Sequence, residues 1–91
     1  MDVFKQGKKL NELGKHEEAI ECLDQAIIEK PDSAAAYFEK GNSLSEMKKN
    51  DEAIECFDKA ISLRPDYAFA YFNKGVCLRR VQKFDEAIES F

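Results

Sequence analysis

The chain has 91 residues and a mass of 10.4 kDa, which is enough for one domain only. Hydrophobic residues make up 44% of it and charged residues 35%, a composition that excludes a disordered tail and an integral membrane protein. The formal net charge of -4 excludes a general nucleic-acid binder, which would carry an excess of basic residues.

No segment of the sequence is apolar enough to enter a membrane. The longest apolar runs, Ala34–Phe38 and Ala68–Phe72, have five residues each, whereas a membrane-spanning helix needs roughly 20. The first nine residues are too charged for a signal peptide. Three cysteines are a poor disulfide framework, and free thiols are typical of a reducing compartment. These features predict a cytoplasmic protein.

An internal repeat of 34 residues organises the chain. When residues 1–34 are aligned with residues 35–68, 16 of the 34 pairs are identical, far more than unrelated segments share. The repeated columns include Gly7, Gly41 and Gly75; Ala19, Ala53 and Ala87; and Pro31 and Pro65. We therefore expect units at about 1–33, 34–67 and 68–91, with the last unit incomplete.

Each unit is predicted to hold two helices, and nothing in the sequence predicts a strand. The expected helices span about 2–14, 17–30, 34–48, 51–64, 68–82 and 85–91. Ser33 offers an N-cap oxygen to the third of these helices, and Asn50 is a candidate cap for the fourth. Apolar residues recur at spacings of three and four, which predicts one buried face on each helix.

Small residues recur where the two helices of a unit are expected to cross. A glycine inside a helix costs about 1 kcal/mol relative to alanine, yet one stands at the same place in all three units. Gly41 and Ala53 would let the two helix backbones approach closely. Larger neighbours such as Tyr37 and Phe57 would then fill the space beside them.

This pattern closely resembles the tetratricopeptide repeat. The resemblance covers the whole chain and rests on the 34-residue period with Tyr37, Gly41, Leu44, Ala53, Phe57, Ala60 and Pro65. Val3 replaces the expected aromatic residue of the first unit, and Lys40 and Lys74 stand where leucine is common. The resemblance implies an all-α fold in which antiparallel helix pairs stack into a right-handed superhelix, a helical-repeat solenoid.

Members of this family bind a partner segment along a concave face that the first helix of each unit lines. The residues expected to bind a partner here are Phe4, Lys8, Asn11, Phe38, Asn42, Ser45, Phe69, Phe72, Asn73, Val76 and Arg79. Phe4, Phe38 and Phe72 would form a ladder, giving an apolar trough with polar rungs that suits a peptide. The alternative is that these phenylalanines only thicken the packing between helices, in which case Phe38→Ala would lower stability rather than affinity.

One subclass of the family grips the C-terminal carboxylates of heat-shock chaperones with concave lysines and asparagines. Asn42 and Asn73 match the asparagine positions of that subclass when the second unit is treated as the first. The positions where it needs lysines hold Phe4 or Phe38, depending on the register, and Phe69. Phenylalanine cannot hold a carboxylate, so we expect the chain not to belong to this subclass.

Other chemistry is scarce in the sequence. His16 is the only histidine and lies in the expected turn between the first two helices, where a solvated or capping role is the simplest interpretation. The cysteines and the histidine are spaced for neither a metal site nor a nucleophile pair. The sequence therefore predicts no enzyme, no catalytic or metal site and no cofactor.

Two functions remain, and both involve other proteins. The first is an interaction module, a scaffold or adaptor that binds a protein or peptide partner, with no role for nucleic acid or membrane. The alternative is a structural spacer or self-assembling segment of a longer repeat protein. Asp2 and Lys9 would keep the N-terminal face solvated, whereas the face around Cys77 is expected to be partly uncovered. Weak self-association through that C-terminal face would follow.

Overall fold

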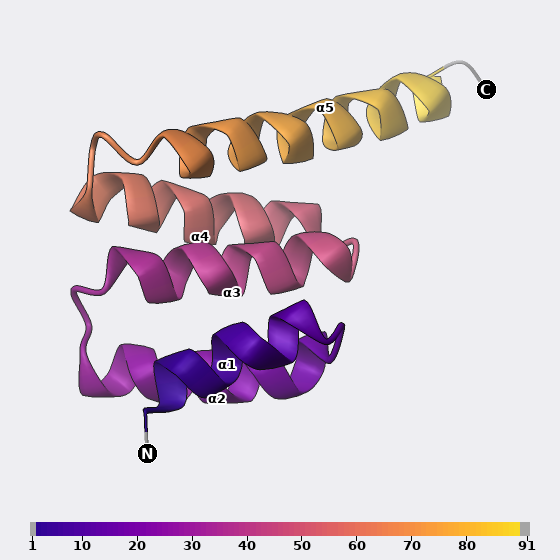
Figure 1. The fold of residues 1–91 in the computed structure, drawn as a ribbon. Coiled ribbons are helices and arrows are strands. Elements are labelled where there is room, and N and C mark those ends of the chain that lie inside the picture. Colours follow the sequence, from indigo (N-terminus) through magenta and orange to yellow (C-terminus); the bar gives the residue numbers. More distant parts are fainter. Residues whose placement is uncertain (1, 90–91) are drawn as a thin grey trace.

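The computed structural model describes residues 2–89, except for the side chains of residue 84 and residues 86–89 (Figure 1). Within that range the chain forms five helices and no strand. The helices are α1 (Val3–Glu12), α2 (His16–Glu29), α3 (Ala34–Glu46), α4 (Asn50–Leu63) and α5 (Ala68–Glu89). The predicted all-α helical repeat is confirmed.

The helices stack in chain order, each against the one before it (Figure 1). α1 and α2 form one antiparallel pair, and α3 and α4 form the next. The first helices of successive units also touch, because α3 contacts both α1 and α5. This second set of contacts places α1, α3 and α5 beside one another, and side chains of all three line the candidate site.

Local chemistry explains where the helices begin. Asp2 Oδ1 accepts hydrogen bonds from the backbone nitrogens of Phe4 and Lys5, at 3.0 and 3.2 Å. Ser33 Oγ accepts one from the backbone nitrogen of Ala36 at 3.1 Å, so the predicted cap of α3 is confirmed.

The predicted capping role of Asn50 is wrong. Asn50 is the first residue of α4, and the residue at the N-cap position, Lys49, makes no side-chain capping bond. A backbone bond from Lys49 N to Leu44 O, 2.9 Å long, closes the turn before α4 instead. That bond caps the C-terminal end of α3, and α4 begins without a side-chain cap.

The close helix crossing predicted at the glycine column is confirmed in the first two units. A Cβ atom on Gly7 would lie 2.8 Å from Leu23 Cγ, and one on Gly41 would lie 2.6 Å from Phe57 Cε1. Leu23 and Phe57 are both fully buried. Only glycine lets these large side chains sit directly against the neighbouring helix backbone.

The lysines that depart from the family pattern form two ion pairs related by the repeat. Lys40 contacts Asp24, with its Nζ 2.7 Å from Oδ1, and Lys74 contacts Asp58 in the same way. Burial lowers the pKa of Lys40, but the hydrogen bond and the charge of Asp24 outweigh burial, so the pKa is raised overall. Each pair joins the second helix of one unit to the first helix of the next.

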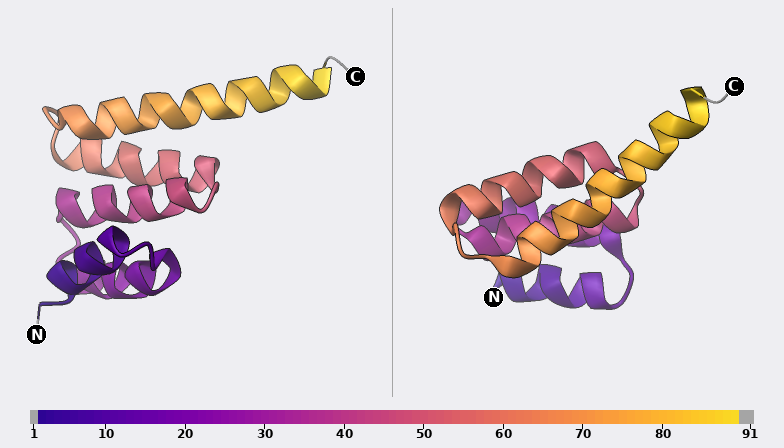
Figure 2. Two further views of the ribbon diagram at one scale, coloured as in Figure 1. Left: turned by 45° about the vertical axis from the view of Figure 1, so that its right-hand side comes forward. Right: turned by 90° about the horizontal axis from the view of Figure 1, so that it is seen from above.

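The prediction of two helices at 68–82 and 85–91 is wrong over the described residues. α5 runs without a break from Ala68 to Glu89 and extends beyond the turn between α3 and α4 (Figures 1 and 2). The earlier turns need left-handed backbone, at Gly14 (φ 78) and Lys48 (φ 65). Their repeat counterpart is Gln82, which is helical.

Burial offsets the cost of the turn at Lys48. Left-handed backbone costs a non-glycine residue roughly 1–2 kcal/mol. The helix that follows this turn, α4, has 14 residues and buries Ala53, Cys56, Phe57 and Ala60. At Gln82 the backbone stays helical, so no such cost arises there.

The state of the thiols agrees with the prediction from the sequence. Cys22, Cys56 and Cys77 are all free, as predicted. Cys56 and Cys77 are buried, and burial raises the pKa of the Cys56 thiol. Among residues 2–89, no helix combines the length and apolar character that crossing a membrane requires.

Candidate functional site

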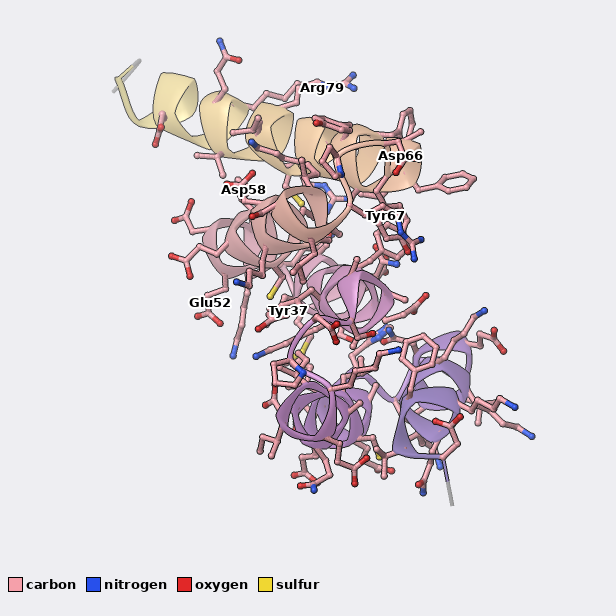
Figure 3. The ribbon with its side chains drawn as sticks, turned by 90° about the vertical axis from the view of Figure 1, so that its left-hand side faces the viewer. Tyr37, Glu52, Asp58, Asp66, Tyr67 and Arg79 are labelled. Atoms are coloured by element: carbon pink, nitrogen blue, oxygen red, sulfur yellow. The ribbon has the colours of Figure 1, made fainter. Side chains whose placement is uncertain are left out.

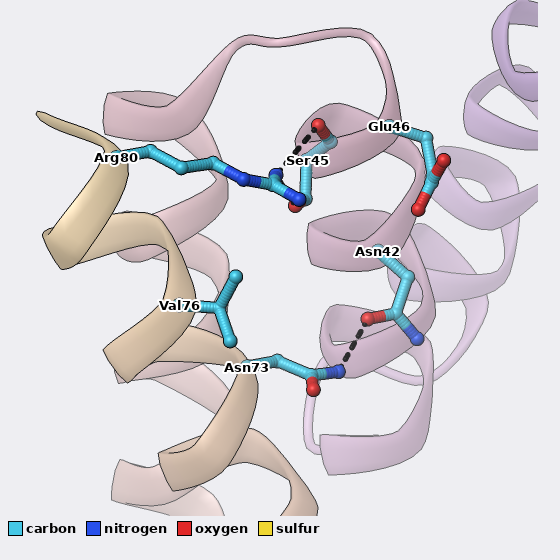
Figure 4. A pocket seen from close by; sticks show the side chains of 6 residues that line it. All are labelled: Asn42, Ser45, Glu46, Asn73, Val76 and Arg80. Carbon is cyan, nitrogen blue, oxygen red and sulfur yellow. Dashed lines mark hydrogen bonds between the residues drawn. The ribbon is translucent and has the colours of Figure 1, made fainter. Parts of the chain in front are cut away.

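A polar groove runs along α1, α3 and α5. It consists of two adjoining pockets of about 490 and 200 Å³, which share Asn42, Glu46 and Asn73. We call it the α1–α3–α5 groove, and its side chains are Asn11, Glu12, His16, Glu39, Asn42, Ser45, Glu46, Asn73, Val76 and Arg80. Figure 4 shows the part between α3 and α5.

Two asparagines meet at the centre of this groove. Asn73 Nδ2 donates to Asn42 Oδ1 at 2.8 Å (Figure 4). Within the described residues, neither Asn42 Nδ2 nor Asn73 Oδ1 makes a hydrogen bond to the protein. One amide therefore still offers donors and the other an acceptor, the combination that a peptide backbone satisfies.

At the α5 end of the groove, an arginine reaches across to α3. Arg80 Nη1 donates to the Oγ and the backbone oxygen of Ser45, at 3.0 and 3.4 Å (Figure 4). Cys77 Sγ lies 3.5 Å from the same Ser45 Oγ. Val76 stands between the Arg80 and Asn73 side chains and supplies the apolar part of this pocket.

Arg79, which the sequence predicts in the groove, does not line either pocket. It projects from the side of α5 that faces away from α4 (Figure 3). Its repeat counterparts, Asn11 and Ser45, both contact the first helix of the following unit. Within residues 2–89 no helix follows α5, so Arg79 has no such contact to make.

At the α1 end, Asn11 is used to join α1 to α3. Its Nδ2 donates to the backbone oxygen of Glu39 at 2.9 Å and to Glu39 Oε2 at 3.3 Å. Its Oδ1 accepts from Ser43 Oγ and lies 2.9 Å from His16 Nδ1. Ser43 is fully buried. Asn11 therefore holds adjacent units together and satisfies the buried hydroxyl of Ser43, which leaves it little capacity for a partner.

The phenylalanines do not form a continuous ladder in the groove. Phe38 is half-buried and packs against two aromatic rings, Phe57 at 5.9 Å and Tyr67 at 4.9 Å between centroids. Phe69 and Phe72 are each 70% exposed and line neither pocket of the groove. For Phe38, the alternative of helix packing describes the structure better than the trough.

The remaining predicted residues lie at the N-terminal end. Phe4 is half-buried in a separate pocket between the start of α1 and the end of α2, which Asp2, Ala26 and Lys30 also line. Lys8 is exposed on α1 and lines neither pocket of the groove. The groove thus contains five of the predicted residues, namely Asn11, Asn42, Ser45, Asn73 and Val76.

Sequence reasoning missed the charged residues of the groove. Glu12, Glu46 and Arg80 share one repeat column, and Glu39 shares a column with Asn73. On α3, Glu39, Asn42 and Glu46 follow one another at spacings of three and four, which marks one helix face. That spacing was the signal that could have identified them.

The groove is acidic over α1 and α3. Glu12, Glu39 and Glu46 contribute three carboxylates, and Arg80 is the only Lys or Arg side chain among its described lining residues. Burial raises the pKa of Glu39, and the hydrogen bond from Asn11 and the charge of Lys8 act in the opposite direction. The charge of Glu12 raises it further.

This raised pKa predicts that Glu39→Gln increases the free energy of unfolding, by an amount that depends on pH. A raised folded-state pKa means that wild-type stability is fully present below the unfolded-state pKa and falls as the pH rises through the folded-state pKa. Glutamine does not ionise, so the variant should be the more stable chain at pH 7. The difference should vanish below about pH 4, where glutamate is protonated in both states. Urea unfolding of both chains at pH 3.5 and 7 measures the difference in stability. A variant that is less stable than wild type at pH 7 would contradict the prediction.

Within residues 2–89, no three histidine, cysteine or acidic side chains come together in a way that could hold a metal ion. The groove holds amides, a hydroxyl, carboxylates and one guanidinium, which are groups that bind by hydrogen bonds and charge. Its arrangement therefore suits recognition of a polar chain.

Comparison with known proteins gives a consistent result. Models of the tetratricopeptide repeat match residues 34–67 and 56–89, and a model described as a TPR repeat matches residues 7–48. No curated protein matches the chain.

Solved structures with the same fold include MamA and a chaperone-binding domain. A crystal structure of MamA has a TM-score of 0.85 and 31% sequence identity, over 96% of this chain and 51% of that one. The second TPR of Spaghetti (RPAP3), bound to the HSP90 peptide SRMEEVD, has a TM-score of 0.86 and 25% identity, over 96% of this chain and 81% of that one. This chain thus spans about half the length of the MamA structure. The 34-residue period, the stacked helix pairs and the three family matches together show that the chain belongs to the tetratricopeptide repeat family.

Proposed function

We propose that the chain is a protein-interaction module, a scaffold or adaptor, that binds an extended segment of a partner protein in the α1–α3–α5 groove. The observation that carries this proposal is the Asn42–Asn73 pair, which keeps amide donors and an acceptor available at the centre of the groove. Paired donors and acceptors can hold a peptide backbone whatever its side chains are. A cytoplasmic location and a protein partner, rather than nucleic acid or membrane, remain part of the proposal.

The charge of the groove supports a basic partner segment. The groove is lined by three carboxylates and one guanidinium, and that guanidinium already donates a hydrogen bond to Ser45. Lysine or arginine side chains of a partner would lie best over Glu12, Glu39 and Glu46. Because these carboxylates are at least partly exposed, the contribution of charge should weaken as salt is added.

The chaperone peptide of the structural neighbour supplies a matched probe. That neighbour binds SRMEEVD, whereas this chain has Phe38 and Phe69 where the carboxylate-binding subclass needs lysines. Fluorescence anisotropy would compare labelled SRMEEVD with the same peptide carrying lysine in place of both glutamates and the aspartate. We expect the lysine version to bind at least tenfold more tightly.

Two variants show whether binding uses the groove. Asn73→Ala should lower the affinity for the lysine peptide about tenfold, the usual effect of losing a well-placed hydrogen bond pair. Lys59→Ala, on the exposed part of α4, should leave this affinity unchanged. Equal affinity for the two peptides would contradict the proposal of a basic partner segment. An unchanged affinity of Asn73→Ala for the lysine peptide would contradict binding in the groove.

A further inference from the structure

A histidine lies at the α1 end of the groove with only one of its ring nitrogens engaged. His16 is the first residue of α2, is half-buried and lines the larger pocket of the α1–α3–α5 groove. Its Nδ1 atom lies 2.9 Å from Asn11 Oδ1. The other ring nitrogen, Nε2, makes no hydrogen bond to any described residue. One edge of the ring is therefore held by α1, and the other edge is available.

The hydrogen bonds of Asn11 determine which nitrogen of the ring carries a hydrogen. Asn11 Nδ2 lies 2.9 Å from the backbone oxygen of Glu39, and a carbonyl oxygen can only accept, so this end of the amide must be the NH2 group. The end that contacts Ser43 and His16 is then the amide oxygen, which also can only accept. His16 Nδ1 must therefore donate to it. In the uncharged ring, Nε2 then carries no hydrogen and is an acceptor.

This end of the groove thus presents acceptors from three helices. Glu12 is the last residue of α1, and His16 is the first of α2. Glu39 and Glu46 lie on α3, and all four side chains line the same pocket. Three carboxylates and one ring nitrogen therefore surround the space that a partner side chain would enter.

Such a set of acceptors suits a guanidinium group better than an ammonium group. A guanidinium spreads five N–H donors over a plane, so one group can bond a carboxylate and a neighbouring ring nitrogen at once. An ammonium group carries its three donors at one point and is more strongly hydrated, so it loses more when water is removed. Arginine would therefore use more of these acceptors than lysine.

From these observations we propose that the α1 end of the groove binds an arginine side chain of the partner segment, and that His16 Nε2 accepts one of its N–H groups. The carboxylates of Glu12, Glu39 and Glu46 supply attraction for any basic side chain, and His16 supplies the preference for arginine over lysine. This proposal rests on the function proposed above and adds the side chain that the groove selects.

The state of the ring can be measured in the free protein, before any partner is added. His16 is the only histidine, so its two ring nitrogens give the only imidazole signals in a ¹⁵N NMR spectrum. At pH 8, where an imidazole is uncharged, we expect Nδ1 to carry the hydrogen and Nε2 to carry none. A ring that carries its hydrogen on Nε2 would overturn the proposal, whether or not a peptide binds.

Two peptides test the occupant by fluorescence anisotropy at pH 8. Both derive from the lysine peptide described above, and one has lysine and the other arginine at every basic position. The arginine version should bind wild type about fivefold more tightly, the effect of one additional hydrogen bond. His16→Asn should remove this preference by lowering the affinity for the arginine version alone. Asparagine keeps an NH2 group for Asn11 Oδ1 but has no atom in place of Nε2, and Asn50 already holds the same repeat position in α4.

Glu17→Gln is the matched control, because Glu17 lines a pocket with His16 outside the groove. This variant should keep the preference for arginine. Equal affinity of wild type for the two peptides, or a preference that survives His16→Asn, would overturn this proposal and leave the basic partner segment in place. If neither peptide binds, the proposed function is wrong and this proposal fails with it.

Discussion

Phe57→Ala is expected to lower the free energy of unfolding by about 3–5 kcal/mol, the usual cost of removing a buried phenylalanine. Phe57 is fully buried and packs on the backbone of Gly41 and the ring of Phe38. Chemical denaturation followed by circular dichroism measures the change.

Phe69→Ala is the matched control, because it deletes the same side chain at a site that is 70% exposed. Its effect should stay within about 0.5 kcal/mol. The free energy of unfolding of a natural protein is only about 5–15 kcal/mol. Phe57→Leu therefore provides a milder change if Phe57→Ala fails to fold. Equal effects at positions 57 and 69 would contradict the packing described for Phe57.

The same substitution should have opposite effects at two glycines of one repeat column. Gly41→Ala should lower the free energy of unfolding by about 1–3 kcal/mol, because its Cβ atom would lie 2.6 Å from the buried ring of Phe57. Gly75→Ala should raise it by about 0.5–1 kcal/mol, because alanine is the better helix former and the site is open.

Both variants are to be unfolded at low micromolar concentration, where a single chain is measured. The sign is the informative result, since helix propensity alone would make both changes stabilising. Two stabilised variants would show that Phe57 yields easily to the added methyl group. Two destabilised variants would show that the site at Gly75 is not open.

The repeat was predictable from sequence because its causes are local or recur at a fixed spacing. The 34-residue period, the cap at Ser33 and the need for glycine at Gly41 follow from helix periodicity, capping and close packing, and the structure contains each of them. Three free cysteines and the all-α class were also correctly predicted.

Only the tertiary structure decided which side chains remain available on the surface. Asn11 and Phe38 stand at the expected binding positions by register, yet Ser43 of the next unit engages Asn11, and Tyr67 at the end of the same unit engages Phe38, each about 30 residues away in the chain. The repeat predicts a turn at Gln82, whereas α5 runs through it, so the period alone did not determine the length of this helix. Periodicity thus determined the first four helices and their order, whereas contacts between residues far apart in the chain determined the contents of the groove.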